Sequence, residues 1–293
     1  MHPDAVERLR NRYRVVADFE LGTDPGRLLP AVAEARALIV RNLTRVDRPL
    51  LDAAPRLEVV GRLGVGMDNI DVEACNSRGI AVRTAAGANA VSVAEHVIGA
   101  LLALSRPHLL ATDRVAAGEW PRTDLIGREV AGRRLAILGL GATGREVARR
   151  ASALGMVVVA SDPFVTDAPF PLLAFPEVLD GADAVSIHVP LTAETRHLID
   201  RAAIERLAPD ALLVDCSRGG VVDHQAVIDA LQDSRLAGAA LDVFPVEPLD
   251  GEAAARYRNV PGLVLSPHLA GITVESNRRV GTVVAEAVTE VLG

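Results

Sequence analysis

The sequence is poor in several residue types, and each shortage excludes a class of protein. Only 2 of the 293 residues are cysteine, so a disulfide framework is excluded. The formal net charge is −7 and no block of Lys or Arg occurs, which argues against a nucleic-acid partner because phosphate binding needs clustered cations. The 7 histidines include no pair at metal-ligand spacing, so no metal site is expected.

Long hydrophobic runs and targeting signals are also missing. The longest apolar run near the middle of the chain covers residues 97–104, far short of a membrane span. The start, Met1-His2-Pro3-Asp4, has no signal-peptide pattern. We therefore expect a cytoplasmic protein with no membrane partner.

Short apolar runs alternate with amphipathic stretches through the second half of the chain. This alternation predicts an α/β fold with a doubly wound parallel sheet and right-handed crossovers. The expected strands are 135–139, 156–161, 184–187, 212–216, 238–242 and 263–265. The expected helices between them are 144–154, 201–206 and 223–232.

The first hundred residues repeat this pattern on a smaller scale. Strands are expected at 37–40, 57–61 and 80–82, and a helix at 4–14. A long helix at 91–104 would link the two parts, and a helix at 274–292 would return to the first. We expect one domain from 1–92 with 267–293 and a second from 93–266, with the ligand in the cleft between them.

A glycine loop, G-L-G-A-T-G, occupies residues 139–144 between an expected strand and an expected helix. Gly139 permits the tight turn, Gly141 lets the backbone approach a pyrophosphate, and Gly144 lets helix pack on strand. The next strand leads to Asp162, an acid that can accept from both ribose hydroxyls and would repel a 2′-phosphate. The 93–266 domain is therefore expected to bind a dinucleotide, NAD rather than NADP.

Three residues downstream of this loop can carry out hydride-transfer chemistry at a carbonyl. Arg218 can orient and polarise the carbonyl, and His268 can move the proton. Glu247 can keep the imidazole basic enough for that task. Together they predict an oxidoreductase.

Seven stretches of the chain resemble one enzyme family. Besides the glycine loop they are V-G-R-L-G-V-G-M-D-N-I-D (60–71), N-A-V-S-V-A-E-H (89–96), H-V-P-L-T (188–192), V-D-C-S-R-G-G-V-V-D (214–223), A-L-D-V-F-P-V-E-P (240–248) and S-P-H-L-A-G (266–271). By these motifs the chain resembles the D-isomer-specific 2-hydroxyacid dehydrogenases, and most closely their phosphoglycerate dehydrogenase branch. The resemblance implies two Rossmann-like domains, with the NAD-binding domain inserted in the substrate-binding domain.

The resemblance also implies a role for individual residues. Arg218 would bind the carboxylate and carbonyl oxygen of the substrate, and His268 would be the acid in reduction and the base in oxidation. Glu247 would hydrogen-bond His268 and favour its protonated form. The implied cofactor-binding set is Val65, Gly139, Gly141, Ala142, Thr143, Gly144, Asp162, Val189, Cys216, Ser217, Asp242 and Gly271. The implied substrate-binding set is Arg62, Leu63, Gly64, Val65, Arg218 and His268.

The partner and the chain start are further expectations from the resemblance. The family is usually dimeric around the region after the linking helix, where Trp120 lies, so a homodimer is expected. Family members usually begin with a strand before the first helix. This sequence has no such strand, so either the start is truncated or the small domain lacks an edge strand.

The substrate is less specified than the reaction. Phosphoglycerate dehydrogenases carry an arginine at the position of Arg62, near the substrate phosphate, and Arg41 and Arg45 lie in a loop that faces the same cleft in relatives. These residues favour oxidation of D-3-phosphoglycerate to 3-phosphohydroxypyruvate. The alternatives are a 3-sulfolactate dehydrogenase, a glyoxylate/hydroxypyruvate reductase and, in another class, an NADH-sensing corepressor-like protein. The alternative for Arg62 is a surface charge.

Overall fold

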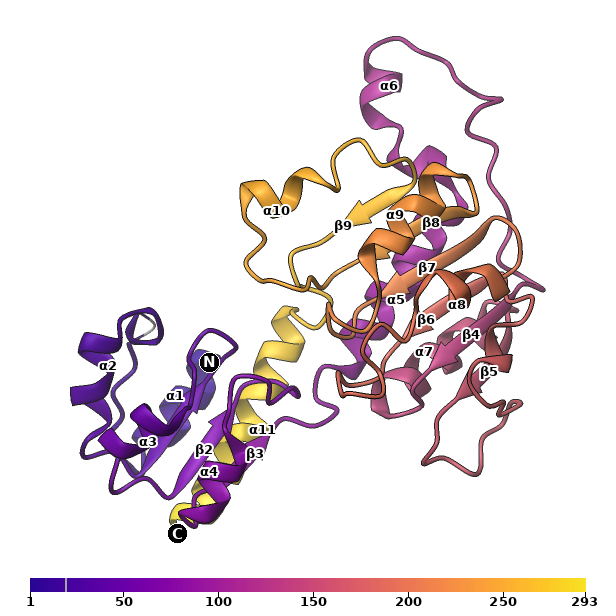
Figure 1. Ribbon diagram of the computed structural model, residues 1–293. Coiled ribbons are helices and arrows are strands. Elements are labelled where there is room, and N and C mark those ends of the chain that lie inside the picture. The colour runs from indigo at the N-terminus through magenta and orange to yellow at the C-terminus, as the bar shows by residue number, and fades with distance from the viewer. Residues whose placement is uncertain (19) are drawn as a thin grey trace. The chain divides into compact units, whose positions relative to one another are not determined.

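The computed structural model describes residues 1–18 and 20–293, which divide into two compact units (Figure 1). Unit 1 is Met1–Asn89 with Ile272–Gly293, and unit 2 is Ala90–Gly271. Among the helices of these described residues, none combines the length and hydropathy needed to cross a membrane.

Unit 2 is built on a six-stranded sheet in which every neighbouring pair is parallel. Its order is β5-β4-β6-β7-β8-β9. The strands are β4 (Arg134–Leu138), β5 (Val157–Ser161), β6 (Ala184–Ile187), β7 (Ala211–Asp215), β8 (Leu236–Leu241) and β9 (Leu263–Leu265). The chain winds from β4 to one side through β5 and then returns past β4 to β6. This reversal places a ligand-binding switch point at the carboxyl ends of β4 and β6.

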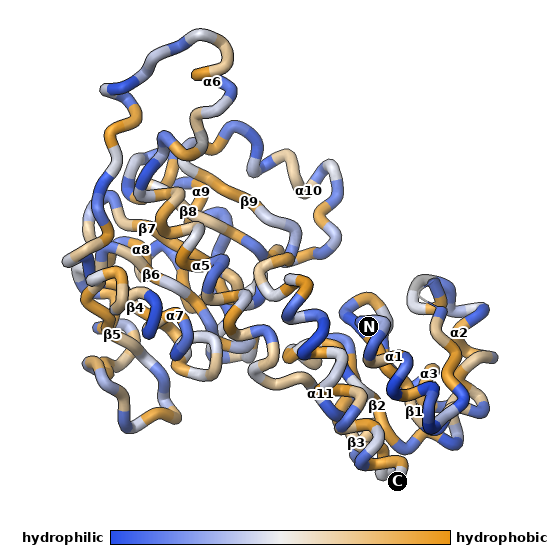
Figure 2. The backbone as a smooth tube through the Cα atoms, turned by 180° about the vertical axis from the view of Figure 1, so that it is seen from behind, coloured by the Kyte–Doolittle hydropathy of each residue, from blue (hydrophilic) through white to orange (hydrophobic). Residues whose placement is uncertain are grey.

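Helices cover both faces of this sheet, as a doubly wound fold requires (Figure 1). Leu135 and Ile137 pack with the helices α5 (Ala90–Ser105) and α7 (Ala142–Ala153). The alternate residues Ala136 and Leu138 pack with α8 (Arg201–Arg206) and α9 (His224–Gln232). Apolar residues accordingly concentrate along the strands (Figure 2). The predicted doubly wound parallel sheet is confirmed.

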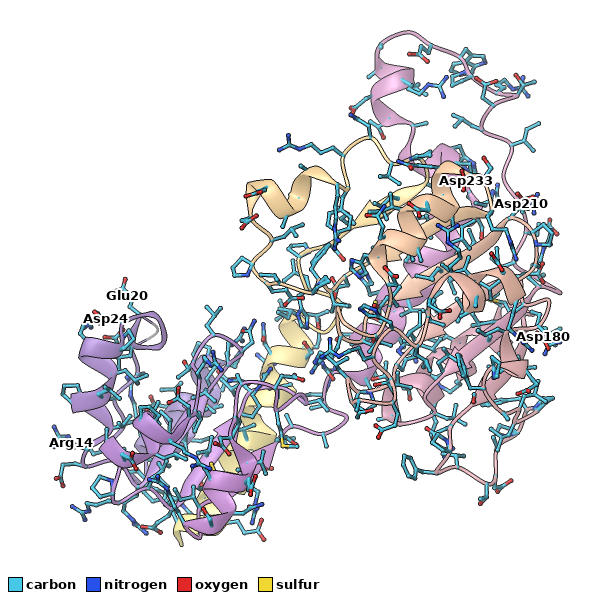
Figure 3. The ribbon with its side chains drawn as sticks, in the orientation of Figure 1. Arg14, Glu20, Asp24, Asp180, Asp210 and Asp233 are labelled. Carbon is cyan, nitrogen blue, oxygen red and sulfur yellow. The ribbon has the colours of Figure 1, made fainter. Side chains whose placement is uncertain are left out.

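Short helices complete unit 2. They are α6 (Thr112–Ala116), α10 (Gly251–Ala255) and the 3₁₀ turns η2 (Pro107–Leu110) and η3 (Glu177–Leu179). Surface ion pairs join Arg206 to Asp180 and Arg128 to Asp210, and both acids lie at the periphery of this unit (Figure 3). Each such exposed pair contributes at most about 1 kcal/mol.

Unit 1 is a smaller α/β layer structure. Its parallel sheet has the order β1-β2-β3, with β1 (Ala37–Val40), β2 (Val59–Arg62) and β3 (Ala81–Thr84). One face packs against α2 (Pro25–Val32), α3 (Arg48–Ala53) and α4 (Val72–Ser77), which follow the turn η1 (Leu21–Thr23). On the other face lies α11 (Val274–Leu292), which in turn packs against α1 (Pro3–Arg10).

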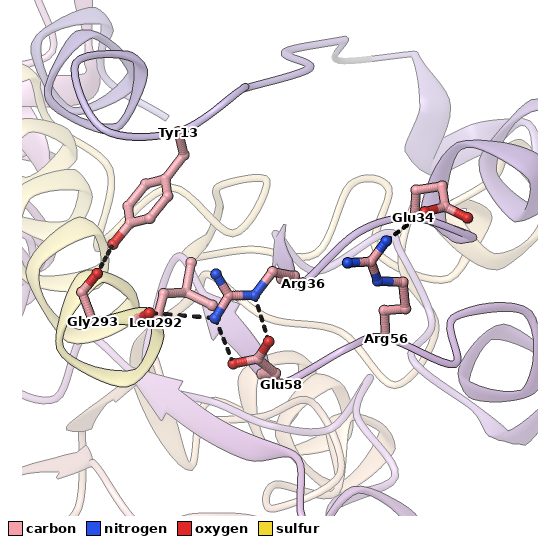
Figure 4. Close-up of polar contacts among 7 residues, drawn as sticks. All are labelled: Tyr13, Glu34, Arg36, Arg56, Glu58, Leu292 and Gly293. Carbon is pink, nitrogen blue, oxygen red and sulfur yellow. Dashed lines mark hydrogen bonds and ion pairs between the residues drawn. The ribbon is translucent and has the colours of Figure 1, made fainter.

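Glycine at position 61 sets how closely α11 lies on β2. A Cβ at Gly61 would be 2.7 Å from Val284 Cγ1 and 3.0 Å from Val288 Cγ2. The last turn of α11 is held by Tyr13, whose hydroxyl donates to the Gly293 carbonyl, and by Arg36, which donates to the Leu292 carbonyl (Figure 4). The return of the chain to unit 1 therefore completes its core.

The helices of unit 1 differ from the sequence expectations in two respects. The first helix ends at Arg10 and not at 14, because Asn11 is its C-cap. The three short helices α2, α3 and α4 were not predicted, since six to eight residues carry little periodicity. Each nevertheless begins with an aspartate N-cap: Asp24, Asp47 and Asp71 accept from the N–H three residues later.

Candidate active site

The glycine loop lies where β4 meets α7, at the switch point of the unit 2 sheet. Gly139 has a φ of +88°, and a Cβ there would be 2.8 Å from the His188 carbonyl oxygen. A Cβ at Gly144 would be 2.0 Å from the Gly139 carbonyl oxygen. Packing within the protein therefore requires glycine at both positions, whether or not a ligand binds.

Gly141 differs from the other two glycines because a Cβ there would meet open space. It is the N-cap of α7, and no side chain caps that helix. The N–H groups of Ala142 and Thr143 thus begin a 12-residue helix beside an open position. This arrangement fits a pyrophosphate, because a helix N-terminus offers N–H donors and a positive dipole end to an anion.

Asp162 follows β5 and is tied to the glycine loop. One carboxylate oxygen accepts from the Leu140 N–H at 2.7 Å, and the other accepts from the Phe164 N–H at 2.9 Å. A carboxylate has about four acceptor sites, so two remain for hydroxyl donors. Asp162 is therefore tied to the glycine loop at the carboxyl ends of β4 and β5.

Arg218 stands on the loop that follows β7. The segment begins with Asp215, whose Oδ1 accepts from both the N–H (2.9 Å) and the hydroxyl (2.6 Å) of Ser217. Arg218 itself donates from Nη1 to the Ser217 carbonyl at 2.7 Å. A Cβ at Gly219 would be 1.9 Å from the Phe244 carbonyl carbon, so this loop touches the segment that carries Glu247.

Glu247 and His268 form the hydrogen-bonded pair that the sequence predicted. His268 Nδ1 lies 2.7 Å from Glu247 Oε2, and the two side chains are 38% and 28% exposed. The Phe244 N–H donates to the other oxygen, Oε1, at 2.9 Å. Burial raises the pKa of Glu247, but the hydrogen bonds from His268 and Phe244 and the charges of His268 and Arg218 bring it below its ordinary value. Glu247 is thus charged at neutral pH, and the field of Arg218 reaches it.

The segment that carries His268 is fixed by the buried Asp242. The carboxylate of Asp242 accepts from the Ser266 hydroxyl (2.5 Å) and from the N–H groups of Leu269 (2.9 Å) and Ala270 (2.8 Å). The Asp242 carbonyl accepts from the His268 N–H. His268 has a φ of +54°, a left-handed conformation that costs a non-glycine residue about 1–2 kcal/mol. The bonds to Asp242 hold this conformation in place.

Of the remaining predicted cofactor residues of unit 2, Val189, Cys216 and Ser217 lie at the carboxyl ends of the central strands β6 and β7, and Gly271 follows the edge strand β9. Val189 follows β6, and its Cγ1 would be 3.1 Å from a Cβ at Gly139. Cys216 and Ser217 follow β7, and Gly271 ends unit 2. Burial and the charges of Asp242 and Asp215 raise the pKa of the Cys216 thiol, so it stays protonated. Burial lowers the pKa of the neighbouring His188 to about 4, so that side chain stays neutral.

The predicted substrate residues 62–65 lie in unit 1, where β2 ends. Arg62 Nη1 donates to the Leu63 carbonyl at 2.6 Å. The Leu63 and Gly64 N–H groups donate within this unit, to the carbonyls of Val40 and Arg62. Val65, the next residue, is 45% exposed.

Two parts of this site were not predicted from the sequence. Asp215 is fully buried beside the Arg218 loop, and the Phe244 N–H holds Glu247. The first had a signal, since an acid directly after the apolar run A-L-L-V is unusual. The second had none, because it depends on how the chain turns after β8.

Comparison with known proteins agrees with this geometry. The family model for the D-isomer specific 2-hydroxyacid dehydrogenase NAD binding domain matches residues 98–270. An (S)-sulfolactate dehydrogenase of Chromohalobacter salexigens is 48% identical, over 100% of this chain and 96% of its own length. A D-3-phosphoglycerate dehydrogenase of Methanocaldococcus jannaschii is 37% identical over 100% of this chain, which spans only 56% of that relative.

A solved structure supports the same assignment. The TT0316 protein of Thermus thermophilus superposes with a TM-score of 0.88 at 32% identity, covering 99% of this chain and 93% of its own. The likeness to it and to the (S)-sulfolactate dehydrogenase extends over nearly the whole chain. The chain therefore belongs to the D-isomer-specific 2-hydroxyacid dehydrogenase family, whose members are NAD-dependent enzymes that act on a CH–OH group.

Proposed function

We propose that Arg218, Glu247 and His268 are the catalytic residues for the oxidation of a small 2-hydroxy acid. The observation that carries this proposal is the 2.7 Å contact between His268 Nδ1 and Glu247 Oε2. Because Nδ1 is used by Glu247, Nε2 is the nitrogen that remains to take the hydroxyl proton. The negative charge of Glu247 stabilises the imidazolium that results, and Arg218 binds the carboxylate and the C2 oxygen.

The cofactor residues follow from the same geometry. The open position at Gly141 and the N–H groups of Ala142 and Thr143 would hold the pyrophosphate, and Asp162 the adenosine ribose. Asp242 and the residues Val65, Val189, Cys216, Ser217 and Gly271 would line the nicotinamide half. When bound, NAD accepts the hydride from the hydroxyl-bearing carbon. Unit 2 is thus the proposed cofactor unit and unit 1 the proposed substrate unit.

For the substrate, we infer a 2-hydroxy acid with an anionic group on C3. Arg62 ends β2, and Arg41 follows β1, the neighbouring strand, with its Nη2 held by Asn277 Oδ1 at 2.9 Å. The N–H groups of Val65 and Gly66 would bind the carboxylate, since those of Leu63 and Gly64 already donate to carbonyls of unit 1.

Two compounds fit this inference, (S)-3-sulfolactate and D-3-phosphoglycerate. The residues by themselves favour phosphoglycerate, but the 48% identity to an (S)-sulfolactate dehydrogenase favours sulfolactate, which we place first. The S label describes the same handedness as a D-2-hydroxy acid, because sulfur changes the naming priority.

The test is NADH formation with NAD and a matched panel of both sulfolactate enantiomers, D-3-phosphoglycerate, D-glycerate and D-lactate. We expect the highest kcat/KM with (S)-3-sulfolactate, followed by phosphoglycerate. Equal or higher kcat/KM with D-lactate or D-glycerate would contradict a role for a C3 anion. NADP in place of NAD should support little turnover because Asp162 repels the 2′-phosphate.

We also propose that the enzyme is a homodimer. Four large apolar side chains between α5 and β4 are exposed: Leu109 (58%), Val115 (47%), Trp120 (76%) and Ile126 (75%). A second copy of this chain would cover them. Light scattering should give twice the chain mass of 30.9 kDa, and Trp120→Ser should lower it toward the monomer. A wild-type monomer at micromolar concentration would refute the proposal.

A further inference from the structure

Three rings form a buried cluster behind the segment that carries Glu247. Phe244 lies 6.0 Å from His224 and 5.6 Å from Tyr257, centroid to centroid, and all three pairs meet edge to face. The exposed fractions are 2% for His224, 5% for Tyr257 and 8% for Phe244. The rings come from the start of α9, the segment after β8 and the segment after α10, so the cluster joins three separate parts of unit 2.

A chain of polar contacts orders this cluster. Arg256 Nη2 donates to the Tyr257 hydroxyl at 2.5 Å, and its Cζ lies 4.7 Å from the Tyr257 ring centroid. His224 Nδ1 lies 2.7 Å from the same hydroxyl. Because an arginine can only donate, the hydroxyl accepts from Arg256, and the direction of its contact with His224 Nδ1 follows the tautomer of that ring. Burial and the charge of Arg256 lower the pKa of His224 to about 4, which agrees with a neutral ring.

The main chain of Phe244 connects the cluster to the proposed catalytic residues. Its N–H donates to Glu247 Oε1, and the other oxygen of Glu247 contacts His268. Its carbonyl carbon lies so close to Gly219 that no Cβ fits between them, and Gly219 is the residue after Arg218. A shift of Phe244 would therefore displace both the Glu247 carboxylate and the loop that carries Arg218.

We propose that Tyr257, acting with His224 and Arg256, is a positioning residue for the dehydrogenase reaction. The hydroxyl of Tyr257 fixes the ring cluster, the cluster fixes the Phe244 main chain, and the Phe244 N–H aims Glu247 at His268. The inference rests on the proposed catalytic roles of Glu247 and His268. It assigns a role to three residues outside the proposed substrate-binding and cofactor-binding sets.

The matched pair of variants is Tyr257→Phe and Tyr13→Phe, each of which deletes one tyrosine hydroxyl. Tyr13 is the other of the 2 tyrosines, and its hydroxyl donates to the Gly293 carbonyl in unit 1. With the preferred substrate, Tyr257→Phe should lower kcat by about tenfold, since a small misplacement of a catalytic group is costly. The Kd of NADH and the KM of the substrate should stay near the wild-type values. Tyr13→Phe should leave all three unchanged.

A proton NMR signature makes the result independent of the substrate. The His268 Nδ1–H bonded to Glu247 should give a downfield resonance, assigned by its loss in His268→Gln. Tyr257→Phe should move or broaden this resonance, and Tyr13→Phe should not. Arg256→Gln changes an exposed residue and removes the guanidinium that donates to the Tyr257 hydroxyl, and it should shift the resonance in the same direction to a smaller extent.

Retention of the wild-type kcat and of the downfield resonance in Tyr257→Phe would overturn the proposal, even if the variant melts at a lower temperature. A wild-type protein that shows the resonance but oxidises no member of the panel would instead count against the proposed substrate. The two failures are thus distinguishable.

Discussion

Asp215 is the residue whose environment departs most from that of an ordinary carboxylate. It is fully buried, its Oδ1 takes both donors of Ser217, and its Oδ2 has no hydrogen-bond partner among the described residues. Burial raises the pKa of Asp215 to about 7, the Ser217 bonds and Arg218 oppose the rise, and the nearby Asp242 adds to it. Below that pH the residue is a neutral acid.

This raised pKa makes stability depend on pH in a defined direction. The folded protein keeps the proton up to about pH 7, whereas the unfolded chain loses it near its ordinary value of 3.8. The stabilising contribution is therefore complete below pH 3.8 and is lost as the pH rises through 7. Asp215→Asn cannot ionise, so its Tm relative to wild type should increase between pH 5 and pH 8, by about 5 °C.

The control for this substitution is Asp233→Asn, at an exposed position after α9 (Figure 3). Melting followed by circular dichroism at several pH values would show the difference. If the Tm of Asp215→Asn runs parallel to that of wild type across this range, Asp215 is not a neutral acid in the folded protein.

At the scale of secondary-structure elements, two glycines of the 139–144 loop have different requirements. Gly144 is required for folding, and Gly141 is proposed to leave space for the cofactor. A methyl group at Gly144 collides with the Gly139 carbonyl oxygen, whereas one at Gly141 meets open space. Gly144→Ala should therefore destabilise the fold by about 1–3 kcal/mol. Gly141→Ala should leave the Tm almost unchanged but raise the Kd of NADH at least about tenfold, because the methyl group occupies the space for the pyrophosphate.

Thermal melting and a fluorescence titration with NADH would measure both effects. The informative outcome is the contrast between the two variants. Tight NADH binding by a well-folded Gly141→Ala would show that the cofactor does not approach this loop.

The sequence predicted these elements well where a pattern extends over several residues. The alternation of buried strands and helices placed β6, β9 and α8 with their observed bounds. Short helices were predicted unevenly, because the pattern placed α8 but not α3, which also has six residues and an aspartate N-cap.

The sequence predicted which residue types make up the candidate site, but it did not predict the contacts that hold those residues in place. The pairing of Glu247 with His268 came from motif order and resemblance. The contact of Gly219 with Phe244 and the left-handed φ of His268 join segments that follow different strands. Such contacts depend on the strand order and on loop geometry, which no local pattern records.

At the scale of the whole molecule, the residues proposed to bind the substrate and the cofactor are divided between the two units. The chain carries a net charge of −7, and all of its 31 Lys and Arg residues are arginine. The overall field therefore repels a dianionic substrate, and local arginines must attract it. Arg62 belongs to unit 1, while the glycine loop and the three proposed catalytic residues belong to unit 2.

This division predicts a selective effect of Arg62→Gln. The KM for the substrate with a C3 anion should rise about 10- to 100-fold, which is what a lost charged hydrogen bond costs. The Kd of NADH and the kcat/KM for D-lactate should stay near wild type. A similar loss with D-lactate would mean that Arg62 acts only by holding the 62–65 loop, through its bond to the Leu63 carbonyl.

The measurement that tests the account most directly compares His268→Gln with wild type in NADH formation from the preferred substrate, alongside a fluorescence titration with NADH. Loss of the proton-accepting imidazole should lower kcat by about 10²- to 10⁴-fold, while the Kd of NADH stays within a factor of about two. Turnover near the wild-type rate in the folded, NADH-binding variant would show that His268 is not the acid–base residue, and the proposed mechanism would be wrong.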